Sequence, residues 1–275
     1  MRPLVVEILA RYLGAELAQL VVPGYTLMLA LGAIVGAMLA VAAAHRDGVP
    51  RTSSVSVLMA AYVSGLAGAC AVPGAQAVLS WIDGGRLAPP TGFAAYGGLA
   101  FGTLGGLAWI RIRHREIDAW RFLDAVAPSL ALGIFFARVG CFLAGCDYGT
   151  PTSSFVGTAF PRGSHAFRDH VARGWIDATA TSSLPVHPTE LYEAGVGLAL
   201  FFAVGAMKSD RRGARFVTLV LAYALARSAI ELVRGDASRG HVGALSTSQI
   251  FAIVTSAAVL AAFAWTHTRT KARAA

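Results

Sequence analysis

Arg227 and Glu231 are charged residues inside a long apolar stretch, four positions apart, and Arg138 directly follows the apolar run 130–137. An ionisable side chain inside a membrane span costs about 2.5 kcal/mol or more, so it normally faces a partner, a cavity or water. The i, i+4 spacing puts Arg227 and Glu231 on one helix face. These residues predict either a structural ion pair or a site for a charged ligand, and snorkelling to the interface is the simpler explanation for Arg138.

Three arginines in the outer half of a membrane can bind a phosphate. Guanidinium groups grip phosphate oxygens through a planar fork and stay charged when partly buried. We expect Arg138, Arg227 and Arg234 to converge there with Glu193 and Glu231. The glutamates would orient the arginines, and either could accept a proton if it is buried. The expected ligand is therefore the headgroup of an anionic phospholipid.

A second polar segment, 186–193, opens another apolar stretch. Pro188 suits a first helical turn, and acidic residues there face the positive end of the helix dipole, so capping alone explains part of the pattern. His187 and Tyr192 add titratable or hydrogen-bonding groups at the membrane surface, where packing does not require them. We interpret the segment as part of a site.

The composition predicts the elements that position these groups. Of the 275 residues, 56% are hydrophobic and 14% are charged, against about a quarter charged in soluble domains. A spanning helix needs roughly 20 mostly apolar residues. We therefore predict an all-α, polytopic membrane protein with one membrane domain, 1–275, and about seven spans. The windows are 23–44, 56–79, 92–110, 120–143, 188–207, 215–234 and 247–266.

The basic residues indicate an orientation. The formal charge of +8 lies in short runs between apolar stretches, which is typical of topology signals and argues against nucleic acid as a partner. Alternate loops place thirteen Lys and Arg on the side of the C-terminus and seven on the other. This bias predicts an N-terminus outside, a C-terminus in the cytoplasm, and an extracytoplasmic loop region at 144–186. The first twenty residues are typical of an amphipathic interfacial helix.

The remaining signals leave alternatives open. Glycines inside the spans are interpreted as helix-packing positions. Cys141 and Cys146 can pack, bind a metal or form a disulfide, and a disulfide requires the helix to break near Gly145 because five helical positions separate the two residues by about 140°. His165 and His170 are expected at the surface. The glycines interpreted in this way are Gly32, Gly36, Gly65, Gly68, Gly102, Gly105 and Gly106.

Several segments together resemble the prolipoprotein diacylglyceryl transferase family, and the resemblance covers most of the chain. Tyr25 to Met28 resembles the first-span tyrosine segment of the family, and Tyr96-Gly97-Gly98-Leu99 is similar to its His-Gly-Gly-Leu. Arg138 to Gly149 is similar to Arg-x-Gly-Asn-Phe through Glu-x-x-Gly, with Arg138, Gly140 and Gly149 retained. His187 to Glu193 is similar to His-Pro-Ser-Gln-Leu-Tyr-Glu, and Arg227 to Arg234 is similar to Arg-x-x-x-Glu-x-x-Arg.

The resemblance implies a multi-pass enzyme of the bacterial inner membrane that moves diacylglyceryl from phosphatidylglycerol, or another anionic phospholipid, to the lipobox cysteine of a prolipoprotein. It implies no cofactor and no metal. The acceptor thiolate would attack the glycerol carbon that carries the phosphate and expel glycerol phosphate. The residues expected to take part are the catalytic Arg138, Arg227, Glu193, Glu231, Tyr96 and His187, and the substrate-binding Tyr25, Gly97, Gly98, Gly140, Gly149, Tyr192 and Arg234.

Four departures from the family pattern fall on polar positions. Cys141 replaces the signature asparagine, Cys146 replaces the signature glutamate, and Tyr96 replaces a histidine. The second-span arginine is missing around 68–72. His187, Glu193, Glu231 and Tyr96 all remain candidates for the general base. A related transferase with another acceptor, or an anionic-lipid-binding protein without catalysis, therefore stays open beside the lipoprotein enzyme.

Overall fold

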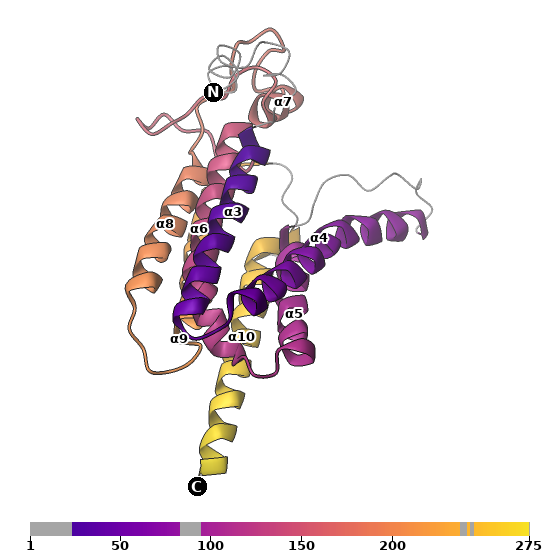
Figure 1. Ribbon diagram of the computed structural model, residues 1–275. Helices are drawn as coiled ribbons and strands as arrows, with labels where there is room; N and C mark the ends of the chain where they lie inside the picture. The colour runs from indigo at the N-terminus through magenta and orange to yellow at the C-terminus, as the bar shows by residue number, and fades with distance from the viewer. Residues whose placement is uncertain (1–23, 83–94, 237–240, 243–244, 275) are drawn as a thin grey trace, which may run out of the picture. The chain divides into compact units, whose positions relative to one another are not determined.

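The computed structural model describes residues 24–82, 95–236, 241–242 and 245–274 (Figure 1). The predicted all-α class is confirmed. A single pair of two-residue antiparallel strands, β1 (His241–Val242) and β2 (Leu245–Ser246), interrupts the helices of this part of the chain. The helices are α3 (Gly24–Arg46), α4 (Arg51–Ile82), α5 (Ala95–Arg113), α6 (Ala119–Ala144), α7 (His165–Ala172), α8 (Thr189–Ala206), α9 (Ala214–Glu231) and α10 (Thr247–Ala274).

Each of the seven predicted windows lies largely on one helix, and five described helices are long and apolar enough to cross a membrane. These are Gly24–Arg46, Arg51–Ala71, Ala119–Ala144, Thr189–Ala206 and Thr247–Thr268. The other two windows lie on α5, which is rich in glycine, and on α9, which carries the charges Arg215, Arg227 and Glu231. The count of seven therefore stays a prediction, and so does the orientation. The predicted interfacial helix lies outside the described residues.

Large apolar side chains cover the outer faces of these helices. Met38 on α3 is 67% exposed and Leu225 on α9 is 75% exposed. In water such continuous apolar exposure is unfavourable, whereas lipid tails are themselves apolar. The exposed faces agree with a membrane as the surrounding solvent.

The chain divides into two compact units, residues 1–36 with 127–275, and residues 37–126. In the second unit, α4 and α5 pack through glycines. A Cβ added at Gly65 would lie 3.0 Å from the carbonyl oxygen of Gly98, and one at Gly102 would lie 3.1 Å from that of Ala61. The packing role predicted for these glycines is confirmed, because a larger residue would push the backbones apart.

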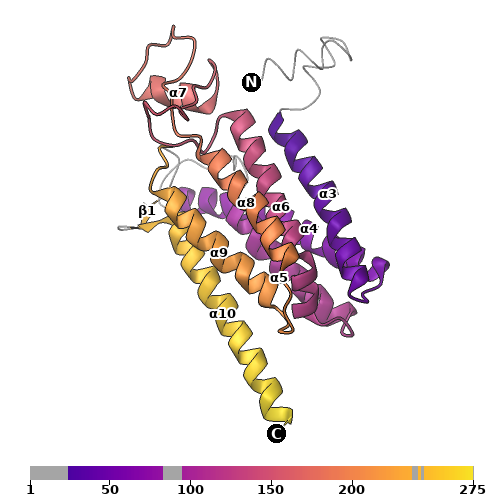
Figure 2. The same ribbon diagram turned by 90° about the vertical axis from the view of Figure 1, so that its left-hand side faces the viewer.

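The first unit holds α6 from residue 127 onward, together with α8, α9 and α10. Figure 2 shows α8 beside α9 and α9 beside α10. Gly197 lets α8 approach α6 closely, since a Cβ at this position would lie 2.9 Å from the carbonyl oxygen of Ala131. The N-terminal part of α3 packs on α6 where a Cβ at Gly140 would lie 3.2 Å from Cδ2 of Tyr25. These contacts pack α3 and α8 against α6.

Residues 145–188 connect α6 to α8 and have a core of their own. Tyr148, Phe160, Ala166 and Val186 are buried together, and Phe142 packs against them. Isolated bridges pair Gly149 with Arg234, and both Pro151 and Thr158 with Val186. The segment that the sequence predicts to be a loop region is therefore held by backbone hydrogen bonds and a small apolar core.

One histidine prediction is wrong. His165 is exposed as expected, but His170 is fully buried. It lies on the inner face of α7 with Ala166 and Phe167, its ring lies against those of Tyr148 and Trp175, and its Nδ1 accepts a hydrogen bond from the Leu184 amide at 3.2 Å. The helical spacing of these residues gives α7 an inner face, which a reading of the segment as a surface loop overlooks.

Candidate functional site

Glu193 lies between two of the predicted arginines. Its Oε1 is 3.0 Å from Nε of Arg138 on α6, and its Oε2 is 3.7 Å from Nε of Arg227 on α9. The glutamate is buried on the first turns of α8. Tyr223, one helical turn before Arg227, donates its hydroxyl to the same Oε1. One carboxylate thus connects three helices.

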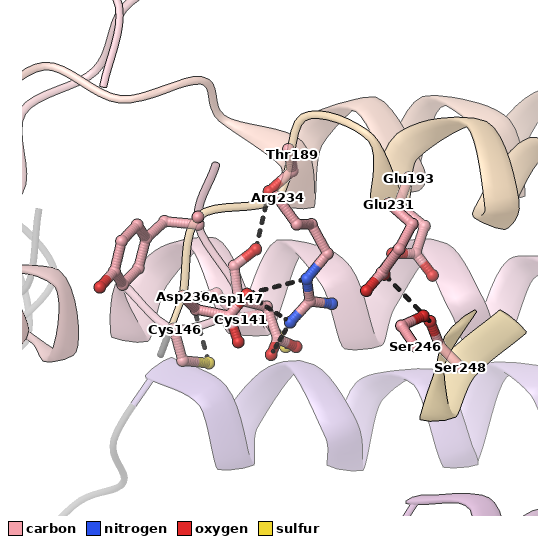
Figure 3. A network of polar contacts seen from close by, with 12 residues as sticks. Cys141, Cys146, Asp147, Thr189, Glu193, Glu231, Arg234, Asp236, Ser246 and Ser248 are labelled. Carbon is pink, nitrogen blue, oxygen red and sulfur yellow. Dashed lines mark hydrogen bonds and ion pairs between the residues drawn. The ribbon is translucent and has the colours of Figure 1, made fainter. Parts of the chain in front are cut away.

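Asp147 forms a second bridge, which sequence reasoning missed. Its Oδ2 lies 2.7 Å from Nη1 of Arg138 and its Oδ1 lies 2.8 Å from Nη2 of Arg234. Asp147 follows the end of α6 and has a φ of 63°, in the left-handed region where aspartate is among the better tolerated residues. Thr189, at the start of α8, donates to the Asp147 carbonyl at 2.7 Å (Figure 3).

The network extends from both ends through further polar groups. Nη1 of Arg227 lies 2.5 Å from Oε2 of Glu231, which also accepts from Ser248 at 3.0 Å. Arg234 pairs with Asp236 at 2.8 Å. Figure 3 shows Glu193 and Glu231 side by side, with the serines of β2 and α10 next to Glu231. The structure therefore brings together all five residues that were predicted to converge: Arg138, Arg227, Arg234, Glu193 and Glu231.

The charges of this network do not sum to a positive pocket. Three guanidinium groups pair with four carboxylates, those of Glu193, Glu231, Asp147 and Asp236. A phosphate that binds the arginines must therefore displace a carboxylate from its arginine or share the arginine with it. The carboxylates keep the arginines oriented, which agrees with the role expected from the sequence.

Burial works against the ionisation of Asp147, but the guanidinium groups of Arg138 and Arg234 outweigh it. They hold the pKa of this carboxyl below its ordinary value. Asp147 is thus an anion near neutral pH. It pairs with two of the three arginines, Arg138 and Arg234.

His187 and Tyr192 lie beside the network but pair with each other. Their side chains approach to 3.1 Å between Nδ1 and the hydroxyl oxygen. The backbone of His187 holds Gly149, whose amide donates to the His187 carbonyl at 2.8 Å. A Cβ at Gly149 would lie 2.6 Å from Cβ of His187 and 2.8 Å from the Val233 carbonyl oxygen. Gly149 is thus a point of close backbone approach.

Three predicted residues belong to the other compact unit. Tyr96, Gly97 and Gly98 lie in the first turn of α5, and the position of the Tyr96 side chain is outside the described part of the structure. Gly98 faces α4, where a Cβ would lie 3.4 Å from the Gly65 carbonyl oxygen. The roles expected of these three residues stay predictions.

Glu190 is a buried acidic residue near the network that the sequence did not single out. Its side chain is 1% exposed, and neither carboxylate oxygen has a hydrogen-bond partner among the described residues. Asp147, Arg234 and Arg138 are its charged neighbours. Glu190 lies in a predicted first helical turn, where acidic residues are common because they face the positive end of the helix dipole. Its residue type alone therefore does not indicate a site.

The family model described as prolipoprotein diacylglyceryl transferase matches residues 14–265, nearly the whole chain. The chain belongs to this family. The match includes every residue of the arginine network.

Curated relatives bear the same name. A phosphatidylglycerol–prolipoprotein diacylglyceryl transferase of Clostridium tetani is 29% identical over 244 residues, which cover 87% of this chain and 91% of the relative. A second such enzyme, from Clostridium perfringens, is 34% identical over 59% of this chain and 57% of its own length. The one from Caulobacter vibrioides is 38% identical over 50% of this chain and 47% of its own.

Membership of the diacylglyceryl transferase family makes this protein one of a class of bacterial membrane transferases. The Arg138 and Arg227 segments, which both match the family pattern, meet in the structure: each arginine contacts one carboxylate oxygen of Glu193. Two of the departures from the family pattern, Cys141 and Cys146, lie near Asp147, which pairs with Arg138. Cys141 donates to Oδ2 of Asp147 at 3.6 Å, and Cys146 directly precedes Asp147.

Proposed function

We propose that this protein transfers diacylglyceryl from phosphatidylglycerol to the cysteine of a prolipoprotein at the outer face of the bacterial inner membrane, and releases glycerol phosphate. Family membership and the names of the relatives support the reaction. The observation that carries the assignment of the site is the bridge of Arg138 and Arg227 through one buried glutamate.

The reaction needs aligned reactants and stabilised charge rather than a nucleophile of the enzyme. The thiolate sulfur of the acceptor forms a bond to the glycerol carbon, the bond between this carbon and the phosphate oxygen breaks, and the electron pair leaves with glycerol phosphate. The thiol proton goes to a base of the site or to the departing phosphate. Guanidinium groups that gain a stronger contact as charge develops on the phosphate lower the barrier.

The ion pairs of the site fit this use of the arginines. Arg138 contacts its carboxylates through Nε and Nη1, and Arg227 does the same. A phosphate oxygen would share each guanidinium group with its carboxylates or displace one of them. Arg234, which shares Asp147 with Arg138, would contact the same headgroup. Glu193 and Glu231, with His187 and Tyr96, remain the candidates for the base.

The proposed topology has seven spans, with the N-terminus outside and the C-terminus in the cytoplasm. The bias of thirteen basic residues against seven supports this orientation. It places residues 144–186, which follow Arg138, on the outer side. A prolipoprotein lipobox would then reach the site from that side.

A direct assay tests the function. Purified protein in phosphatidylglycerol nanodiscs is incubated with a synthetic lipobox peptide, and peptide mass and free glycerol phosphate are measured together. We expect the peptide to gain one diacylglyceryl group for each glycerol phosphate released. Arg138→Gln should abolish both products, whereas Arg162→Gln, which changes an exposed arginine of the connecting segment, should leave both intact.

A related transferase with a different acceptor is the second candidate, because Cys141, Cys146 and Tyr96 replace polar groups of the family pattern. In that case glycerol phosphate is released with another acceptor and the peptide stays unmodified. If no acceptor leads to release but Arg138→Gln still weakens binding of phosphatidylglycerol, the protein binds lipid without catalysis.

A further inference from the structure

Cys141 and Cys146 lie at the two key positions of a helix-ending turn. The amide of Gly145 donates to the Phe142 carbonyl at 3.2 Å, and the amide of Cys146 donates to the Cys141 carbonyl at 3.2 Å. Gly145 has a φ of 69°. These hydrogen bonds define a Schellman motif, in which the residue after the left-handed glycine contacts the residue five positions before it. The helix therefore breaks at Gly145, as a disulfide would require.

The turn brings the two sulfur atoms together. Both sulfurs and a carboxylate oxygen of Asp147 lie within 4.8 Å of one another. Both thiols are free, Cys141 buried and Cys146 partly exposed. A disulfide needs Cβ atoms about 3.5–4.5 Å apart and a sulfur–sulfur bond of about 2.05 Å. With the sulfur atoms already within 4.8 Å of each other, we expect rotation of the two short side chains to close the remaining distance.

We propose that Cys141 and Cys146 form a dithiol–disulfide couple, a site of reversible oxidation next to the arginine network. Cys146 is the more accessible thiol, so it attacks a small-molecule or protein disulfide, breaks the sulfur–sulfur bond of this oxidant, releases one of its sulfurs as a thiol and forms a mixed disulfide with the other. Cys141 then attacks the Cys146 sulfur and releases the second thiol of the oxidant. Two protons and two electrons leave the pair, and the oxidant takes up both.

We expect oxidation to affect the arginines through Asp147. In the reduced protein the Cys141 thiol donates to Oδ2 of Asp147, the same oxygen that binds Arg138. A disulfide removes this donor and fixes the backbone of the residue that immediately precedes Asp147. The bond itself depends only on the geometry of the turn, whereas an effect on turnover depends also on the proposed function. The expected direction is slower transfer, because Asp147 loses one of the contacts that position it.

A cation is the competing occupant of the same three ligand atoms. Thiolates and a carboxylate suit Zn²⁺. However, Asp147 already pairs with two guanidinium groups, which repel a divalent ion. The local charge therefore favours the disulfide over the metal.

The test uses the full-length Cys70→Ser protein, so that only the two thiols of the turn remain. The protein is treated with oxidised glutathione or with dithiothreitol, alkylated, digested and analysed by mass spectrometry. After oxidation we expect one peptide pair or loop linked between Cys141 and Cys146, no alkylated thiol and a monomer on a non-reducing gel. Dithiothreitol should restore two alkylated thiols.

The single variants Cys141→Ser and Cys146→Ser are the matched controls. Made in the Cys70→Ser protein, each should keep one thiol, and neither should form an internal bond. Two alkylatable thiols after oxidation, or bonds between molecules, would overturn the couple. Protection of both reduced thiols by one equivalent of Zn²⁺ that is lost in Asp147→Asn would overturn it in favour of a metal site.

The lipobox assay separates the two parts of the proposal. Turnover should fall on oxidation of the Cys70→Ser protein and recover on reduction, with no such change in Cys70→Ser/Cys141→Ser. If Cys141 and Cys146 become linked but turnover does not change, the proposed effect of oxidation through Asp147 is wrong. If the reduced protein transfers no diacylglyceryl at all, the proposed function fails, and the mass spectra still decide whether the couple exists.

Discussion

Asp147 and Arg234 are 87 positions apart in the sequence, yet Nη2 of the arginine donates to Oδ1 of the aspartate at 2.8 Å. The pair joins the turn after α6 to the segment after α9. Gly149, two residues after Asp147, also forms an isolated bridge with Arg234. The site is thus fixed where two connecting segments meet, and not only by helix packing.

Asp147→Asn tests this junction. Asparagine also tolerates the left-handed conformation, so the change removes charge with little backbone strain. We expect the free energy of unfolding to fall by about 1.5–3 kcal/mol, the range for hydrogen bonds to charged groups, because Arg138 and Arg234 lose a shared anion. Thermal unfolding in detergent measures the loss. Asp177→Asn at an exposed loop position is the control and should leave the melting temperature unchanged.

Arg227→Lys tests the geometry of the phosphate site while keeping the charge. Lysine cannot span Glu193 and Glu231 with a planar fork and still offer a further donor. We expect turnover in the lipobox assay to fall by about 100-fold, as when one aligned donor is lost from a charge-stabilising site. Arg162→Lys is the matched control. Turnover above half of the unmodified level in Arg227→Lys would contradict a role for the fork.

The sequence predicts the helices and the five converging charged residues because both signals are local. An apolar window marks each helix, and Arg227 and Glu231 mark one helix face by their spacing. Asp147 carries no such signal. It lies in a short turn, and its two partners come from distant segments, so only tertiary structure brings them together. The roles of the assembled residues remain predictions.

Burial of His170 predicts a pH dependence of stability. Loss of solvation lowers the pKa of this imidazole below its ordinary value, and the charge of Asp169 opposes the effect while that of Arg173 adds to it. The unfolded chain therefore binds the proton more readily than the folded protein. The contribution of neutral His170 to the free energy of unfolding is fully present above a pH of about 6.5 and is lost as the pH drops below that value. Thermal unfolding between pH 8 and pH 5, taken as roughly the titration range of histidine, measures it.

His170→Asn provides the control for this effect. The asparagine carbonyl can accept the hydrogen bond of the Leu184 amide but does not titrate in this range. Its loss of stability with acid should be smaller than that of the unmodified protein. His165→Asn, at an exposed position of the same helix, should retain the full dependence. Equal acid sensitivity in all three proteins would place the responsible proton elsewhere.

Glu190→Gln tests the carboxyl group that has no hydrogen-bond partner among the described residues. A buried charge without a partner is costly, and glutamine has nearly the same shape without a charge. We expect an unchanged or higher melting temperature and unchanged turnover, and glutamine is also the residue at this position in the family pattern that the segment resembles. Glu193→Gln is the contrasting variant, because its carboxylate holds two arginines and its loss should lower both quantities. A drop in turnover of Glu190→Gln without a loss of stability would contradict this expectation and would assign Glu190 a part in moving the proton of the acceptor thiol.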